Sequence, residues 1–333
     1  EKSWLLLLMV FAWLWPGVFS HDLWNPDESG LFTATEALLN GTASPLVAHV
    51  FEQHNFHISP AYLWVAGAFQ ALLSPWAADA YAATRFASVF FTAIGLLLCG
   101  FAGFNFLGRH HGRSVVLILI GSIGLLPMAH FISDMSAVFA ALGMVLCGFS
   151  LAHKRVIVGA LLLGGGWALL SLTTGFLLPL ALIVMAFALV LHPQWQFKRY
   201  YLTLIGAFAF ALPLMVVYPL LLLYLQPQMF EMWRDAYMFG TYGGLVDFQT
   251  AFNLPYYLKN LLWFALPAWP LAVWTFIRTK MNAQGWSGLC LAWLILATAL
   301  LAFNPQRFQD HLIWLMPPLA LLGAAQLAGL RRG

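Results

Sequence analysis

Long runs of apolar residues recur along the whole chain and restrict it to one class of fold. The first run, WLLLLMVFAWLWPGVF, covers residues 4–19 and holds no charged side chain. A helix needs roughly 17–25 mostly apolar residues to cross the hydrocarbon core of a bilayer. Charged residues make up only 8% of the sequence, whereas a soluble domain carries roughly 25%. So few charges cannot cover a water-facing surface, and the sequence therefore predicts an integral membrane protein built from spanning helices.

Ten of the apolar runs are predicted to span the membrane, so the expected fold is an all-α transmembrane bundle. One further segment, PAYLWVAGAFQALLSP at residues 60–75, is apolar but short and has a proline at each end. The ten predicted spans lie at about 3–19, 84–107, 114–131, 135–152, 156–172, 174–191, 201–224, 256–277, 285–303 and 311–329.

The distribution of charge decides whether residues 60–75 cross the membrane. Basic residues concentrate in cytoplasmic loops. If residues 60–75 do not cross, 11 of the 15 basic residues fall on the side of Lys2, and 11 of the 12 acidic residues fall on the opposite side. If they do cross, the later basic clusters move outside and the separation is much poorer. We therefore expect both termini in the cytoplasm and residues 60–75 as a helix lying at the outer interface.

This topology predicts one transmembrane domain over residues 1–333, with its long loops outside. The two external loops are expected at about 20–83 and 225–255, and no soluble domain follows the last span in this chain. Long loops on a helical scaffold commonly carry function. The net charge of +3 is small and dispersed, which gives no indication of nucleic-acid binding.

Acidic residues stand directly after the first span and at a later external turn. In DLWNPDES, Asp27 and Glu28 precede a predicted amphipathic helix that begins near Ser29. The pair suits either the acidic N-terminus of that helix or catalytic or metal-binding carboxylates at the membrane surface. Asp134, in HFISDMSAVF, either caps the helix that begins at Met135 or is a functional acid, because acids at this depth are costly.

Histidines and arginines on the same predicted face are candidate ligands. His54 and His57 lie in HVFEQHNFHISP, where imidazole and carboxylate groups are dense enough to hold a divalent metal ion, although the stretch also suits an ordinary polar loop. Arg85 opens a span, where it either extends its charge to the surface or binds a phosphate. Arg307 and Gln306, just before the last span, are further candidates for binding a phosphate-bearing substrate.

With those residues assembled, the chain resembles the GT-C membrane glycosyltransferases, in the branch that holds lipid A aminoarabinose transferases and protein O-mannosyltransferases. The resemblance extends over essentially the whole chain. Six stretches carry it, in the family's order and on the predicted face: DLWNPDES, HISPAYLW, TRFASVFFTAI, HFISDMSAVFAAL, LPYYLKNLLWFALPAWP and HLIWLMPPLALLGA. One departure is that GGLVDFQTAFNLPYY has no counterpart of a metal-binding histidine that some members carry in their second large loop.

The resemblance implies transfer of a sugar from a polyprenyl-phosphate donor on the outer face of the membrane, with inversion at the anomeric carbon. The acceptor would be a lipid, such as a lipid A-like molecule, or a protein, and the closest branch implies a bacterial inner membrane with a periplasmic site. Asp27 matches the principal catalytic carboxylate, Glu28 is its neighbour, and Asp134 matches a second acid. Arg85 matches a donor-phosphate ligand, and Tyr62, in HISPAYLW, completes the predicted substrate-binding residues.

Two other classes of membrane protein are alternatives to a transferase. A transporter or flippase would carry ionisable residues in the middle of its spans, and these spans contain almost none. A non-enzymatic membrane assembly subunit would tolerate the loss of Asp27. The aromatic stretch MFEMWRDAYMFGTYGG suits either sugar stacking or an interfacial aromatic belt.

Overall fold

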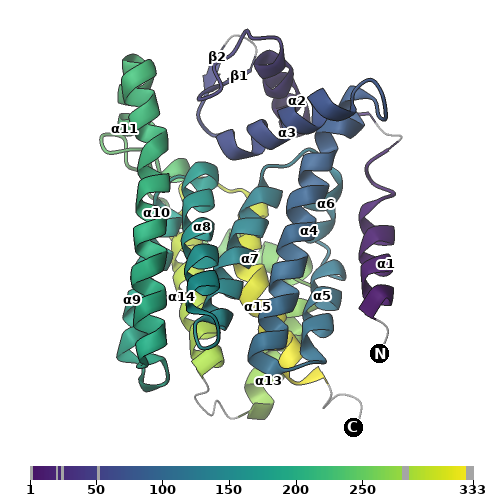
Figure 1. Cartoon of the computed structure of the whole chain (residues 1–333), viewed down its shortest axis with the longest axis vertical. Helices are drawn as coiled ribbons and strands as arrows, with labels where there is room; N and C mark the ends of the chain where they lie inside the picture. Colours follow the sequence, from purple (N-terminus) through teal and green to yellow (C-terminus); the bar gives the residue numbers. More distant parts are fainter. Residues whose placement is uncertain (1–2, 20–21, 24–25, 51–52, 280–284, 328–333) are drawn as a thin grey trace.

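The computed structural model describes the chain except residues 1–2, 20–21, 24–25, 51–52, 280–284 and 328–333. Four helices form the middle of a bundle: α4 (Ala80–Leu107), α7 (Met135–Leu151), α8 (Val156–Thr174) and α10 (Lys198–Leu225). They pack in that order, α4 against α7, α7 against α8 and α8 against α10 (Figure 1). The described part of the chain is therefore an integral membrane bundle, as the apolar runs predict.

Small residues let these helices approach closely. A Cβ added to Gly164 on α8 would overlap the carbonyl oxygen of Ala207 on α10, and one added to Gly143 on α7 would lie 3.1 Å from the carbonyl oxygen of Gly95 on α4. Lipid tails are as apolar as leucine, so helices in a bilayer associate largely through such close backbone packing.

The remaining apolar helices are shorter or interrupted. They are α1 (Ser3–Leu14), α5 (His111–Ile120), α6 (Leu125–His130), α9 (Leu177–Ala188), α12 (Leu254–Phe264), α13 (Ala268–Thr279), α14 (Gly285–Phe303) and α15 (Met316–Ala325). Helix α15 is almost wholly buried and packs mainly against α13 and α5. Short helical turns η1 (Leu189–Leu191), η2 (Pro193–Trp195) and η4 (Gln309–Leu315) join them.

Each of the ten predicted spans has a helical counterpart, but ten crossings are not confirmed. Within the described residues, four helices (α4, α8, α10 and α14) are long and apolar enough to cross a membrane, or five crossings if the bent pair α12–α13 counts as one. That pair bends by 96° where Pro267 follows the end of α12. The run at 114–131 is divided between α5 and α6. Apolar length alone therefore missed the breaks that proline and glycine introduce.

A cap of short elements covers one end of the bundle (Figure 1). It contains α2 (Pro26–Leu39), α3 (Pro60–Leu73) and an antiparallel hairpin of β1 (Ala48–Val50) and β2 (Gln53–Asn55). Helix α11 (Pro227–Ala236) and the turn η3 (Gly240–Tyr242) follow the end of α10. The helices α2 and α3 agree with the sequence predictions, whereas the hairpin corrects the expectation of a purely helical chain.

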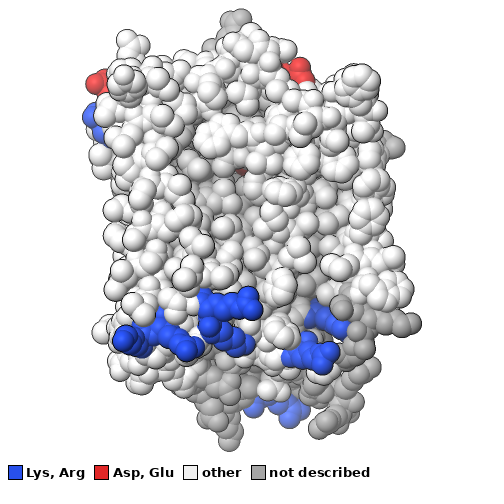
Figure 2. All heavy atoms as spheres, in the orientation of Figure 1, with Lys and Arg blue, Asp and Glu red and all other residues white. Residues whose placement is uncertain are grey.

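Charge separates along the bundle as the topology requires. Figure 2 shows Lys and Arg side chains gathered at the end of the molecule opposite the cap. The ends and turns that carry them include the end of α4 with Arg109, the turn between α7 and α8 with Lys154, and the start of α10 with Arg199. The cap end is therefore the candidate external face.

One buried ion pair fastens the cap to the bundle. Arg85 Nε on α4 lies 2.9 Å from Glu28 Oε1 on α2, and both side chains are only 1% exposed. The same Glu28 oxygen accepts a hydrogen bond from the Ile132 backbone N–H at 3.0 Å, and Arg85 donates to the Asp22 carbonyl at 3.3 Å. These contacts hold the first turn of α2 against α4 and against the segment before α7, and thereby fix the position of Asp27.

Replacing Arg85 by methionine should destabilise the fold strongly, because Glu28 would stay buried without its cation. Breaking one partner of a buried pair costs about 3–5 kcal/mol. The measurement is the unfolding transition of Arg85→Met in detergent. The matched control is Arg234→Met, because Arg234 forms an ion pair with Asp235 in which the two side chains are 40% and 35% exposed. If Arg85→Met shifts the unfolding transition no more than Arg234→Met does, the structural role of the Glu28–Arg85 pair is contradicted.

Candidate functional site

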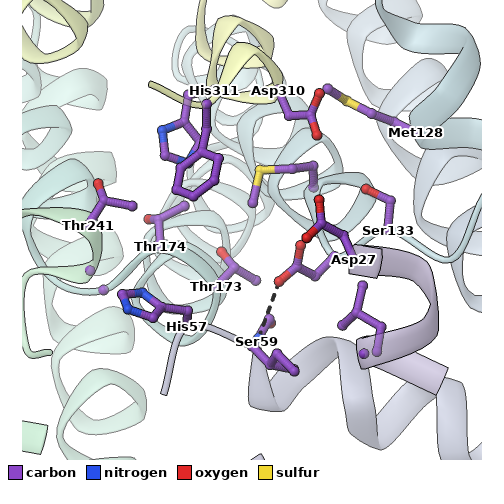
Figure 3. Close-up of a pocket in the computed structure, with 18 of the residues that line it drawn as sticks. Asp27, His57, Ser59, Met128, Ser133, Thr173, Thr174, Thr241, Asp310 and His311 are labelled. Atoms are coloured by element: carbon purple, nitrogen blue, oxygen red, sulfur yellow. Dashed lines mark hydrogen bonds between the residues drawn. The ribbon is translucent and has the colours of Figure 1, made fainter. Parts of the chain in front are cut away.

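A cavity of about 870 Å³ lies between the cap and the ends of the bundle helices (Figure 3). The start of α2 and the loop before α3 form its cap side. The remaining wall comes from α6 and the segment that follows it, the end of α8, α11, η3 and η4, with further residues from α10 and α12. The lining therefore comes from segments far apart in the sequence, most of which lie at helix ends on the cap side.

Three carboxylates face one another on one side of this cavity. They are Asp27 at the start of α2, Asp134 just before α7, and Asp310 in η4. The pKa of Asp134 is raised to about 6, chiefly by burial; the hydrogen bond from the Ser59 backbone N–H opposes this rise, and the negative charges of Asp310 and Asp27 add to it. Burial and the charge of Asp27 also raise the pKa of Asp310. The side of the cavity that holds these three residues is called the acidic side below.

Ser59 connects Asp134 to the cap. Its backbone N–H donates to Asp134 Oδ2 at 3.3 Å (Figure 3), and its hydroxyl donates to the Leu172 carbonyl of α8 at 3.2 Å. That hydroxyl also accepts from the Tyr62 backbone N–H and so caps α3. Asp134 occupies the N-cap position of α7, but its side chain makes no capping hydrogen bond there. The side chain therefore serves the cavity and the cap rather than its own helix.

The opposite side of the cavity carries neutral polar groups. His57, Thr174, Thr241 and His311 lie together on this side in Figure 3. Burial lowers the pKa of His57, so its imidazole is neutral at neutral pH. The Thr174 hydroxyl donates to the Leu170 carbonyl of its own helix at 3.0 Å. These four residues form the neutral side of the cavity.

The cations predicted to bind a phosphate lie elsewhere. No lysine or arginine is found among the described residues that line the cavity. Arg85 is buried against Glu28 and does not extend to the surface, and Arg307 Nε donates to Asn253 Oδ1 at 2.8 Å. Direct phosphate binding by either arginine therefore stays a prediction that no contact in the structure supports.

The other predicted substrate residues are divided between the cavity and the core. Gln306 lines the cavity, and its backbone N–H donates to Asn304 Oδ1. Tyr62 is completely buried, and its hydroxyl shares a 2.7 Å hydrogen bond with Ser88. Glu28, expected beside Asp27 in the site, points instead into the ion pair with Arg85. Of the acid pair, only Asp27 reaches the cavity among the described lining residues.

The two histidines predicted to bind metal are separated. His57 lines the cavity beside Tyr237, with ring centroids 5.1 Å apart, whereas His54 on β2 pairs across the hairpin with His49, at 4.2 Å. In the described part of the chain, no three His, Cys, Asp or Glu side chains lie close enough to hold one metal ion. His54 and His57 therefore do not come together as ligands of one metal ion, and a metal requirement stays a prediction.

Several lining residues were not singled out as site residues from the sequence. Thr173 and Thr174 end α8, where only the following Gly175 marks a boundary. Trp233 and Tyr237 belong to the aromatic stretch that suited either sugar stacking or an interfacial belt, and both line the cavity. Asp310 and His311 closely follow the predicted Gln306 and Arg307. Their position in this external polar cluster is the sequence feature that could have identified them as site residues.

Comparisons with solved structures identify the fold. The chain is similar to ArnT from Cupriavidus metallidurans in the apo state, with a TM-score of 0.77, 14% identity and 97% of this chain covered. A second structure of that protein, bound to undecaprenyl phosphate, matches equally well. The oligosaccharyltransferase of Archaeoglobus fulgidus, tethered with an acceptor peptide, matches with a TM-score of 0.55 and 13% identity, over 99% of this chain and 50% of its own.

The sequence itself matches no protein-family model and no curated protein. The chain spans 59% of the length of the ArnT chain. At such low identity the likeness concerns the fold alone. The described bundle and cap therefore have the same fold as the corresponding parts of ArnT and the Archaeoglobus fulgidus oligosaccharyltransferase, as the resemblance in sequence predicts.

Proposed function

We propose that the protein transfers a sugar from a polyprenyl-phosphate donor to a lipid or protein acceptor. The observation that carries this proposal is the cavity with Asp27, Asp134 and Asp310 beneath the cap of a bundle folded like ArnT. ArnT from Cupriavidus metallidurans has been solved with undecaprenyl phosphate, and AglB from Archaeoglobus fulgidus with a dolichol-phosphate. Both neighbours therefore bind a phosphate carried on a long isoprenoid chain.

In the proposed reaction, an acceptor oxygen forms a bond to the anomeric carbon while the bond from that carbon to the phosphate oxygen breaks. The polyprenyl phosphate leaves with the electron pair, and attack from the opposite face inverts the configuration. If the acceptor is a hydroxyl, its proton passes to a carboxylate. If the acceptor is a phosphate, it is already anionic, and the carboxylates orient the sugar instead.

Asp27 and Asp134 are the proposed catalytic carboxylates, with different contributions. Asp27 stands on the first turn of α2, whose position is fixed by the Glu28–Arg85 pair behind it. Asp134 has its pKa raised to about 6, which makes it a better proton acceptor near neutral pH than an ordinary carboxylate. We assign substrate orientation and acceptor contact to Asp27 and the final uptake of the proton to Asp134.

The position of the cavity favours an enzyme over a transporter or an assembly subunit. Its lining residues come mainly from helix ends and the cap, whereas a transport site lies near the bilayer midplane in broken helices. The cap end is opposite the cluster of Lys and Arg in Figure 2, which supports an external, periplasmic-type location of the site. A bacterial inner membrane is part of the proposal and rests on the resemblance alone.

Asp27→Asn should lower the rate of sugar transfer by about 100-fold or more, because the acceptor and the sugar lose the carboxylate that orients them. The assay follows a labelled polyprenyl-phosphate sugar, from a panel of sugars, into cell-envelope lipid or protein. Asp247→Asn is the matched control, because Asp247 is exposed, lies outside the cavity lining and carries the same carboxylate. Equal rates for wild type and Asp27→Asn would remove Asp27 from the mechanism. Failure of folded wild type with every donor would argue against the transferase.

The transfer rate should fall as the pH drops through about 6. The pKa of Asp134 is raised to about 6, so its carboxylate becomes protonated below that pH and can no longer accept a proton. Asp134→Asn should be about 100-fold slower and should lose this acid limb of the profile. Asp27→Asn, measured on its residual activity, should keep the limb. The same limb in both variants would show that another group titrates.

The orientation in the membrane can be tested with single cysteines, because the native residues Cys99, Cys147 and Cys290 are all buried. Leu245→Cys lies in the predicted second external loop, where Leu245 is 59% exposed. Arg109→Cys lies at the opposite, basic end. A membrane-impermeant maleimide should label Leu245→Cys in cells stripped of any outer membrane and should label Arg109→Cys only after the membrane is opened. The reverse pattern would contradict an external site.

A further inference from the structure

His311 has a rigid position on the neutral side of the cavity. It lies in η4, a 3₁₀ helix in which residues three apart are eclipsed. This geometry places its imidazole parallel to the indole of Trp314, with ring centroids 5.0 Å apart and an interplanar angle of 14°. His311 is 6% exposed, and both residues line the cavity. The ring is therefore held on one face by the indole while one edge remains at the cavity wall.

Asn304 determines which imidazole nitrogen carries the proton. The Gln306 backbone N–H donates to Asn304 Oδ1 at 3.0 Å. A backbone N–H can only donate, so the oxygen of the Asn304 amide must face Gln306 and its Nδ2 must face His311. Asn304 Nδ2 lies 3.0 Å from His311 Nδ1. Since Nδ2 is a donor, Nδ1 accepts, and the proton of the neutral ring resides on Nε2.

The Nε2–H group of His311, a residue of the cavity wall, is available to a ligand. It has no hydrogen-bond partner among the residues that the structure describes. The Nε2 atom nevertheless keeps some accessible surface. A donor at a buried cavity wall with no protein acceptor is suited to an oxygen atom of a ligand, because leaving such a group without a partner costs free energy.

Arg307 supports this arrangement from behind the cavity. Its Nε donates to Asn253 Oδ1 at 2.8 Å, and Asn253 Nδ2 donates to the Asn304 carbonyl at 2.7 Å. The Asn253 backbone N–H in turn donates to the Ala302 carbonyl at 2.8 Å. The arginine thus reaches the site through two asparagines, and its charge is separated from the cavity by them.

We propose that His311, held as its Nε2–H tautomer by Asn304, binds an oxygen of the carrier phosphate. The proposal rests on the proposed function and assigns the phosphate to a neutral donor in place of an arginine or lysine. Asp27, Asp134 and Asp310 repel an anion from the acidic side of the cavity, whereas His57, Thr241 and His311 lie together on the neutral side (Figure 3). A hydrogen bond from a neutral N–H to a charged oxygen is stronger than one between neutral groups.

The first test measures binding of a polyprenyl monophosphate and of the matching polyprenol by native mass spectrometry. Wild type should bind the phosphate more tightly than the alcohol. His311→Leu should lose about ten- to a hundredfold of phosphate affinity, the effect of one hydrogen bond to a charged group, and should bind the alcohol unchanged. His311→Gln, whose amide nitrogen reaches a similar position, should recover most of the loss. Equal phosphate binding by wild type and His311→Leu would overturn the proposal.

The second test observes the His311 imidazole directly in the unsubstituted protein. In protein with ¹⁵N-labelled histidine, the His311 signals, assigned by their loss in His311→Gln, should report an Nε2–H tautomer. The Nε2 signal should shift with the phosphate and not with the alcohol. Asn304→Asp presents a carboxylate to Nδ1, so at pH 8.5 the proton should move to Nδ1 and phosphate affinity should fall. A wild-type Nδ1–H tautomer, or an Nε2 signal insensitive to the phosphate, would overturn the assignment.

Failure of the His311 assignment and failure of the proposed function would give different results. If wild type prefers the phosphate and transfers sugar while His311→Leu does both equally well, the assignment of His311 is wrong and the proposed function stands. If wild type shows no preference for the phosphate over the alcohol, the carrier itself is wrong and both proposals fall.

Discussion

The buried ion pair between Glu28 and Arg85 is the interaction on which the geometry of the candidate site depends. Both charges are almost completely removed from solvent, and such a pair is a weak source of net stability because desolvation offsets much of the attraction. Its structural consequence is specific orientation, because another register of α2 on α4 would leave a charge buried without its partner. Asp27, one residue before Glu28, then points into the cavity. A costly pair in the core thus fixes a carboxylate at the membrane surface.

Hydrogen bonds from Ser59 complete the attachment of the cap. Ser59 contacts Asp134 and α8, while Glu28 contacts α4 and the segment before α7. The cap is therefore fastened on both sides of the cavity, and the two proposed catalytic carboxylates are positioned by the same set of contacts. The raised pKa of Asp134 follows from this closure, because the cap removes water from a carboxylate that already faces two others.

The sequence was sufficient for the class of fold, the sorting of charge and the main acids, because these follow from apolar length and from the position of residues relative to spans. Asp134 could be selected because acids at its depth in the membrane are costly, and both Asp27 and Asp134 match acids of the family that the sequence resembles. The directions of side chains could not be predicted. Arg85 and Arg307 were reasonable phosphate ligands by type, yet one pairs with a buried acid and the other with Asn253. Their partners lie 57 and 54 residues away in the chain, so only tertiary packing could reveal them.

The described cavity lining contains no Lys or Arg, and the three acids on the acidic side give a physical reason for this. A guanidinium placed among Asp27, Asp134 and Asp310 would pair with them, lower the pKa of Asp134 and hold that carboxylate ionised but weakly basic. A neutral imidazole leaves the raised pKa of Asp134 intact while still offering a directed donor to an anion. With the charge of Arg307 behind Asn253 and Asn304, the cavity would be able to hold the proposed phosphate on one side and a basic carboxylate on the other.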